Sequence, residues 1–204
     1  MRSFLFFALI CVIAFTGCTG KQDKTIENIK LGIMKETTAS AKYAAYGQNA
    51  WVEGLDTIAK LFEAASKAEE IHAYNHTLVL KSFKVDMDEF TPEFTVRSTA
   101  ENLKESLEGE TYEVNVMYPM FISDATTKKL KNATIESLTW ALETEKKHVE
   151  MFNKALYALN NNSEYGLPFD YLVCPVCGNT FDKENLPEKC GLCSASKELF
   201  LKIE

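Results

Sequence analysis

The sequence lacks any run or stripe of basic residues. Lysine and arginine total 22, against 29 aspartates and glutamates, which gives a net charge of -7 with histidine counted as neutral. Binding to nucleic acids and other polyanions needs clustered positive charge, so neither is expected as a partner. After the first twenty residues the chain also lacks a hydrophobic run long enough to cross a membrane. Its 204 residues, 46% of them hydrophobic, suffice for one substantial core and a small appendage.

The N-terminus has the features of an export signal. MRSFLFFALICVIAFTGC has one basic residue, an apolar run and small residues before Cys18, which predicts a signal peptide over residues 1–17. Thr16 and Gly17 before the cysteine are similar to a bacterial lipobox, so we expect a lipidated Cys18 and a polar tether over 18–24. An uncleaved anchor helix and an ordinary signal peptide are the alternatives. The body is expected outside the cytoplasm, anchored to a membrane in the periplasm or cell envelope.

Four segments repeat apolar residues at steps of three or four, which predicts four amphipathic helices. They span residues 25–52, 55–83, 98–124 and 128–160. The connection over 84–96 contains a proline and no helical period, so it is expected to be a crossover in a bundle that is not simply up and down. Pro119 predicts a local kink. After NNNSEYGLP the composition shifts to turns and cysteines, so we expect a bundle over 25–162 and a second domain over 166–204.

Glutamates interrupt the apolar stripe of every predicted helix. They are Glu36, Glu69, Glu110, Glu113 and Glu145. Burying an unpaired carboxylate costs several kcal/mol, and five together would exceed a net stability of about 5 to 15 kcal/mol. These side chains must therefore be solvated, protonated or bound to cations.

Metal binding explains these glutamates best. His72 and His148 each follow a stripe glutamate by three residues, which puts both side chains of each pair on one side of a helix. Two such pairs, with Glu36 and Glu110 as single ligands, match the pattern of di-iron bundles. Oxygen-rich sites with one histidine per metal suit iron or manganese better than zinc. The off-stripe glutamates, Glu70, Glu108, Glu143 and Glu150, are predicted to be solvated, and His76 to be a core or outer-layer histidine.

Four cysteines near the C-terminus form two Cys-x-x-Cys pairs. They are Cys174 with Cys177 in CPVC, and Cys190 with Cys193 in CGLC. Two disulfides are the default for an exported protein. A disulfide within either pair would close a strained small ring, whereas two such pairs readily form a tetrahedral site for iron or zinc. A metal site is therefore predicted, with a structural zinc ribbon as the alternative to iron.

Taken in order, these motifs resemble one family. KETTASAKYAAY (35–46), AEEIHAYNH (68–76), EGETYEVNVMYPMF (108–121) and TEKKHVEMF (144–152), followed by a short cysteine domain, are similar to rubrerythrin. The resemblance implies an all-α ferritin-like four-helix bundle with a small C-terminal rubredoxin-like, zinc-ribbon-like metal domain. It also implies a peroxidase that reduces hydrogen peroxide to water and protects against oxidative stress, with electrons entering through a tetrathiolate iron.

The resemblance also assigns roles to individual residues. It makes Glu36, Glu69, Glu110, Glu145 and His148 ligands of two irons that are oxo-bridged when oxidised. It implies that His72 and Glu113 exchange as ligands when the site is oxidised, because ferric ions recruit a further hard oxygen ligand. Tyr43 and Tyr118 match tyrosines near the cluster. Asn179 and the stretch CGLCSAS depart from the usual rubredoxin pattern.

Partners follow from the same resemblance. It implies a homodimer, in which the tetrathiolate iron of one subunit serves the di-iron site of the other. The electron donor, outside the cytoplasm, is unidentified. Two other functions stay open, namely a ferroxidase or iron-handling protein, and a zinc-loaded envelope lipoprotein without enzymatic activity.

Overall fold

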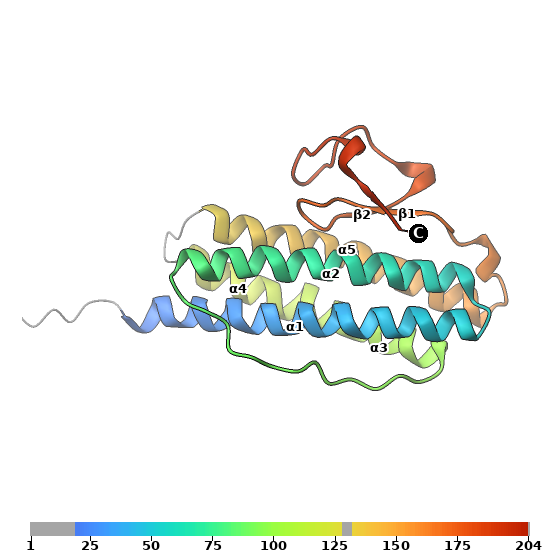
Figure 1. Cartoon of the computed structure of the whole chain (residues 1–204), viewed down its shortest axis with the longest axis horizontal. Coiled ribbons are helices and arrows are strands. Elements are labelled where there is room, and N and C mark those ends of the chain that lie inside the picture. Colours follow the sequence, from blue (N-terminus) through green and yellow to red (C-terminus); the bar gives the residue numbers. More distant parts are fainter. Residues whose placement is uncertain (1–18, 128–131, 204) are drawn as a thin grey trace, which may run out of the picture.

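The protein folds as a four-helix bundle with a small domain on one side, as the sequence predicts (Figure 1). The computed structural model describes residues 19–127 and 132–203, so the predicted signal peptide and Cys18 lie outside the described residues. The helices are α1 (Thr19–Val52), α2 (Asp56–Ser82), α3 (Thr99–Tyr112), α4 (Tyr118–Thr126) and α5 (Asn132–Asn160). Within the described part of the chain, none of the helices combines the length and apolar character that a membrane span requires.

The first helix begins earlier than expected. The backbone is helical from Thr19, so the expectation of a tether before the first helix is corrected for residues 19–24. This segment contains no proline, and adding residues to an existing helix costs little once the first turn has formed. At the other end, Gly54 has a φ of 76° and the amide of Leu55 donates to the carbonyl of Ala50 at 2.9 Å. This glycine cap ends α1 and turns the chain back into α2.

A long crossover joins α2 to α3, as predicted. Residues 83–98 contain no regular element and run along the outside of the bundle from one end to the other (Figure 1). The hydroxyl of Tyr46 donates to the carbonyl of Thr95 at 3.1 Å, and Asn49 donates to the carbonyl of Arg97 at 2.9 Å. Because of this return, α2 and α3 run in the same direction, and the bundle is not simply up and down.

The predicted kink at Pro119 takes the form of a π-helix one turn earlier, over Glu113–Met117. The amide of Tyr118 donates to the carbonyl of Glu113, five residues back. Proline has no amide hydrogen to continue the α-helical pattern. In a regular α-helix residues five apart point about 140° from each other. The wider turn allows Glu113 and Tyr118 both to be buried.

The stripe glutamates lie between two apolar clusters. On one side an aromatic cluster contains Tyr43, Tyr46, Phe62 and Phe152, whose neighbouring rings have centroids 5.3 to 6.4 Å apart. On the other side the buried residues are aliphatic and aromatic, and include Ile29, Leu80, Met117, Phe121 and Leu138. The polar layer in the middle of the bundle is therefore closed off from water at both ends.

The C-terminal domain packs on the bundle of its own chain. Its strands β1 (Tyr171–Val173), β2 (Thr180–Asp182) and β3 (Leu201–Lys202) form an antiparallel sheet in the order β2-β1-β3. It lies over α2 and α5 (Figure 1). Leu167, Tyr171 and Val173 belong to the same apolar cluster as the aromatic residues of the bundle. This shared core fixes the position of the cysteine domain.

Candidate metal centres

Four of the five stripe glutamates and both predicted histidines meet in the middle of the bundle. Two groups of side chains each bring their ligand atoms within 4.8 Å of one another. The first group is Glu36, Glu69, His72 and Glu145, and the second is Glu69, Glu110, Glu145 and His148. Because the groups share Glu69 and Glu145, the arrangement provides two adjacent metal positions with two bridging carboxylates.

The shared glutamates present one oxygen to each histidine. His72 Nδ1 lies 2.9 Å from Glu69 Oε2 and 2.9 Å from Glu145 Oε1. His148 Nδ1 lies 3.1 Å from Glu69 Oε1 and 2.8 Å from Glu145 Oε2. A carboxylate that bridges two metals uses one oxygen for each, so the four residues are already arranged as bridges and end ligands.

Two buried carboxylate oxygens in this layer have no hydrogen-bond partner among the described residues. They are Glu36 Oε2 and Glu110 Oε2. Neither residue is more than 2% exposed. Unpaired buried polar atoms are costly, and cations are the partners that carboxylate oxygens and imidazole nitrogens share. The donor set therefore fits a pair of metal ions.

The pKa values show how strongly the layer needs positive charge. Burial and the neighbouring glutamates hold the pKa of Glu36 and of Glu110 well above the ordinary range. Burial opposes the protonated form of His72, but Glu145 and Glu69 raise its pKa to about 10, and Glu69 and Glu145 raise that of His148 to about 9. Without metal, protons supply the positive charge. Metal binding requires neutral imidazoles and ionised carboxylates, so it displaces these protons.

Glu113 lies beside the ligand groups but belongs to neither of them. It is 9% exposed and lies in the π-helix. Burial and the charges of Glu145 and Glu69 raise its pKa to about 8. The structure thus places His72, rather than Glu113, among the ligand atoms. The exchange of these two ligands stays a prediction.

Two tyrosines hold the single glutamates. The hydroxyl of Tyr43 donates to Glu110 Oε1 at 2.5 Å, and the hydroxyl of Tyr118 donates to Glu36 Oε1. Burial and the nearby Glu110 raise the pKa of Tyr43 far above its ordinary value, so this hydroxyl keeps its proton. Each tyrosine contacts one carboxylate oxygen, Oε1, and the other, Oε2, has no hydrogen-bond partner among the described residues.

The off-stripe glutamates lie at the surface, as predicted. Glu70, Glu108 and Glu150 are exposed, and Glu143 is partly exposed. Glu70 pairs with Lys67 at 2.7 Å and Glu143 with Lys146 at 2.6 Å. The helical period therefore separated the buried glutamates from the solvated ones.

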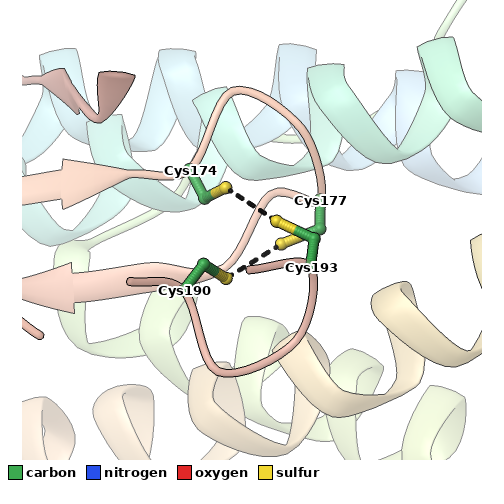
Figure 2. A group of neighbouring side chains, drawn as sticks. All are labelled: Cys174, Cys177, Cys190 and Cys193. Carbon is green, nitrogen blue, oxygen red and sulfur yellow. Dashed lines mark hydrogen bonds between the residues drawn. The ribbon is translucent and has the colours of Figure 1, made fainter. Parts of the chain in front are cut away.

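The four cysteines converge from two turns of the small domain (Figure 2). The sulfurs of Cys174 and Cys193 are 3.4 Å apart, as are those of Cys177 and Cys190. A disulfide would need about 2.0 Å, whereas sulfurs around one tetrahedral metal lie about 3.8 Å apart. All four thiols are free, so the metal-site prediction fits and the disulfide alternative does not. The hydrogen bond from the Cys177 thiol lowers the pKa of Cys174 to about 5, although burial opposes this.

Asn179 has a role that the sequence did not predict. Its side chain is 2% exposed and its Nδ2 donates to Cys190 Sγ at 3.5 Å. In the sequence, this position is only a departure from the rubredoxin pattern. Hydrogen bonds to coordinating sulfurs tune the reduction potential of an iron–sulfur site. Where the usual rubredoxin pattern has an aromatic residue, Asn179 supplies a hydrogen-bond donor to a cysteine sulfur.

One short segment of the cysteine domain touches both histidines of the carboxylate layer. A Cβ built on Gly178 would lie 2.4 Å from His72 Nε2, and the residue has a φ of 80°. Its neighbour Thr180 accepts a hydrogen bond from His148 Nε2 at 3.1 Å and donates to the Gly178 carbonyl at 3.3 Å. Asn75 on α2 also donates to the carbonyl of Val176 at 2.9 Å. Sequence reasoning missed these contacts because they join distant segments.

Both domains match known family models. The model described as Rubrerythrin matches residues 27–156, and the model described as Rubrerythrin, rubredoxin-like domain matches residues 173–201. Rubrerythrin-2 of Clostridium acetobutylicum is 31% identical over 181 residues, which cover 88% of this chain and 97% of that protein. Nigerythrin of Nitratidesulfovibrio vulgaris is 33% identical over 179 residues, which cover 86% of this chain and 85% of the relative.

Solved structures agree with the sequence matches. The fully reduced, all-ferrous state of nigerythrin superposes with a TM-score of 0.77 at 29% identity, covering 94% of this chain and 91% of that chain. A bacterioferritin of Desulfovibrio desulfuricans, at 15% identity and a TM-score of 0.61, covers 71% of this chain and 85% of its own, and shares the fold. The chain thus has two metal centres, a carboxylate–histidine di-iron site and a rubredoxin-like four-cysteine site. The chain belongs to the rubrerythrin family.

Proposed function

We propose that this oxidoreductase is a non-haem di-iron peroxidase that reduces hydrogen peroxide to water and protects against oxidative stress. The contact between the Gly178–Thr180 segment and both histidines of the di-iron site carries the proposal. A four-cysteine iron exchanges one electron at a time, and a two-metal site accumulates two. Contact between the four-cysteine site and the di-iron site suits an enzyme whose di-iron site must be reduced again after each turnover.

The buried ligands suit this chemistry. When bound, two ferrous ions supply the two electrons that convert hydrogen peroxide and two protons into two waters. The four ligand glutamates balance the charge of two ferrous ions, and their burial keeps bulk water away from the site. Glu113 is a fifth carboxylate, close enough for its pKa to respond to Glu145 and Glu69. It is available to balance the added charge of ferric ions, which is why we retain its exchange with His72 as part of the proposal.

Two alternatives have weaker support. A ferroxidase or iron-handling protein obtains electrons from its iron substrate, so it needs no contact between the di-iron site and a one-electron centre. A zinc-loaded scaffold would be redox silent, and the carboxylate-rich donor set suits iron or manganese better than zinc. Neither alternative accounts for the contact of Gly178 and Thr180 with the histidines.

We further propose that electrons pass between the two sites of one chain. The resemblance to rubrerythrin implies that the four-cysteine site of one subunit serves the other subunit. Here the packing of Leu167, Tyr171 and Val173 holds the cysteine domain against its own di-iron site. A homodimer stays a prediction, checked by sedimentation of the metal-loaded protein, but electron transfer does not require it in this arrangement. The external donor that refills the cysteine site is unidentified.

The reaction itself is the first test. Protein reduced without oxygen and containing two di-iron-site irons and one four-cysteine iron per chain is mixed with hydrogen peroxide in a stopped-flow instrument. We expect rapid oxidation of the ferrous sites without release of oxygen, and slower oxidation by dioxygen. Faster oxidation by dioxygen, with ferric iron accumulating beyond the fixed sites, would support the ferroxidase instead. Zinc in both sites of protein isolated from its own envelope would support the scaffold.

Glu145→Ala tests the bridging ligands. Removing a carboxylate that both metal positions share should lower the iron content of the di-iron site and abolish peroxide reduction together. Iron content is measured by elemental analysis and activity by peroxide consumption. Glu150→Ala on the same helix is the matched control, because this glutamate is exposed and should leave both unchanged. A Glu145 variant that keeps its iron and its activity would show that the site has been wrongly assigned.

Gly178→Ala tests the contact between the two sites. The added Cβ would collide with His72 and displace the cysteine domain from α2. We expect electron transfer from the reduced four-cysteine iron to slow, because the added Cβ forces the two sites apart. Gly191→Ala, in the other cysteine pair, has nothing within 4 Å among the described residues and serves as the control. Equal transfer rates in the two variants would refute the intramolecular route.

We also propose that the protein is an exported lipoprotein anchored through Cys18, on the sequence pattern alone. In its own host the wild-type protein should incorporate labelled fatty acid and partition into the detergent phase. Cys18→Ala should lose both properties, because no other residue can take the lipid in this pattern. Cys11→Ala, within the apolar run of the leader, should keep them. Labelling that survives in the Cys18 variant would contradict the proposal.

A further inference from the structure

His76 lies one turn beyond His72 and is fully buried, but it is not a member of either ligand group. Both of its ring nitrogens have partners. Nδ1 lies 2.8 Å from the hydroxyl of Ser137 on α5, and Nε2 lies 3.1 Å from the hydroxyl of Tyr118 on α4. The same tyrosine hydroxyl donates to Glu36 Oε1. Four side chains from four helices thus form one buried hydrogen-bonded chain that ends on a di-iron ligand.

The direction of this chain follows from the donors available. A metal-bound Glu36 is ionised and can only accept, so the Tyr118 proton points to it and the tyrosine oxygen accepts from His76 Nε2–H. Burial, the largest influence on this ring, lowers the pKa of His76, so the ring is neutral and has one N–H. Its Nδ1 therefore accepts from the hydroxyl of Ser137. Every donor in the chain points toward Glu36.

The chain leaves Glu36 with one free oxygen. Oε1 is taken by Tyr118. Oε2 is buried, has no hydrogen-bond partner among the described residues and lies 4.0 Å from His72 Nδ1. A carboxylate can bind a metal through one or both oxygens. A tyrosine hydroxyl fixed from behind by an imidazole N–H keeps Oε1 engaged and limits Glu36 to one.

The fold makes room for the imidazole. A Cβ built on Gly32 of α1 would lie 3.1 Å from Cδ2 of the ring, so a larger residue there would press on His76. The other tyrosine of the site lacks this support. Tyr43 also donates to a single glutamate, Glu110, but its ring packs against Tyr46, Phe62 and Phe152, and among the described residues no histidine is recorded within hydrogen-bond distance of its hydroxyl. The two metal positions therefore differ in their outer contacts.

We propose that His76 is a positioning residue for one of the two metals: with Ser137 it fixes the Tyr118 hydroxyl as a donor to Glu36 Oε1 and reserves Oε2 for the metal on the His72 side. This inference rests on the di-iron site and not on peroxide reduction. It assigns to His76 a role beyond core packing, and it makes the two metal positions unequal.

Manganese(II) binding tests the proposal without any catalytic assay. Mn²⁺ prefers oxygen and imidazole ligands, so with the four-cysteine site filled by zinc an anaerobic titration followed by the EPR signal of free Mn²⁺ reports the two positions of the di-iron site. In His76→Leu, which has no N–H, we expect one dissociation constant to weaken about tenfold, the lower end of the effect of removing a metal ligand's hydrogen-bond partner. The other constant should change far less, because Glu110 and His148 keep their own hydrogen bonds to Tyr43 and Thr180.

Three variants separate positioning from packing. His76→Gln, whose side-chain amide can still donate to Tyr118, should restore most of the lost affinity. In a Tyr118→Phe background, His76→Leu should add no further loss, because the hydroxyl through which it acts is gone. In a Tyr43→Phe background it should weaken binding as it does in the wild type. The thermal unfolding of each metal-free variant is recorded as a folding control.

Several results would overturn the proposal for His76. Unchanged constants in His76→Leu, equal weakening of both, or the same loss in the Tyr118→Phe background would overturn the proposal and leave His76 as a packing residue. Should His76→Leu not fold, Ser137→Ala and His76→Gln carry the test. Ser137→Ala should weaken the same one of the two Mn²⁺ dissociation constants, but to a smaller degree. If both constants are unchanged in Ser137→Ala, or both weaken equally, the proposal is overturned as well.

Discussion

The structure depends on one constraint, the burial of ionisable side chains halfway along a four-helix bundle. Glu69 and Glu145 each present their two oxygens to two different histidines, and apolar clusters close the layer at both ends. Removing one partner of a buried charge network costs about 3 to 5 kcal/mol, a large part of a typical net stability of about 5 to 15 kcal/mol. Folding and metal binding are therefore coupled in this protein, and the ligands cannot be considered apart from the fold.

The irregular parts of the fold serve this layer. The crossover over residues 83–98 lets α3 run parallel to α2, and the π-helix at Glu113–Met117 inserts extra backbone at the level of the site. As a result Glu113 and Tyr118, five residues apart, are both buried near the ligands. π-helices often lie at functional sites, and here the reason is geometric, because an α-helix would turn one of the two residues away.

The cysteine domain completes the site from outside. Gly178 lies over His72 because it has no side chain, and Thr180 accepts the outer hydrogen of His148. Such partners orient metal-bound imidazoles and set their basicity. His76 and Ser137 extend the same principle within the bundle, through Tyr118 to Glu36. Contacts beyond the ligands thus come from both domains and make the surroundings of the two metal positions different.

Much of this architecture could be predicted from periodicity. Glu145 and His148 lie in register with Leu138 and Phe152, so their burial follows from the helical period, and the same reasoning separated Glu69 from the exposed Glu70. The spacing of the four cysteines predicted a metal site because two short turns bring four sulfurs together without help from the rest of the chain. The start of α1 at Thr19 was not predicted, because polar residues without a proline extend a helix as readily as they form a linker.

What the sequence determined by itself was local: which residues face inward along each helix, and which ligands share a turn. Tertiary structure alone decided which distant groups meet. Thr180 reaches His148 across 32 residues, and His76 reaches Tyr118 across 42. No repeating pattern encodes such pairs, because they depend on the packing of helices and domains rather than on the geometry of one backbone segment. The residues that face the polar layer were therefore readable in the sequence, whereas the contacts that orient them were not.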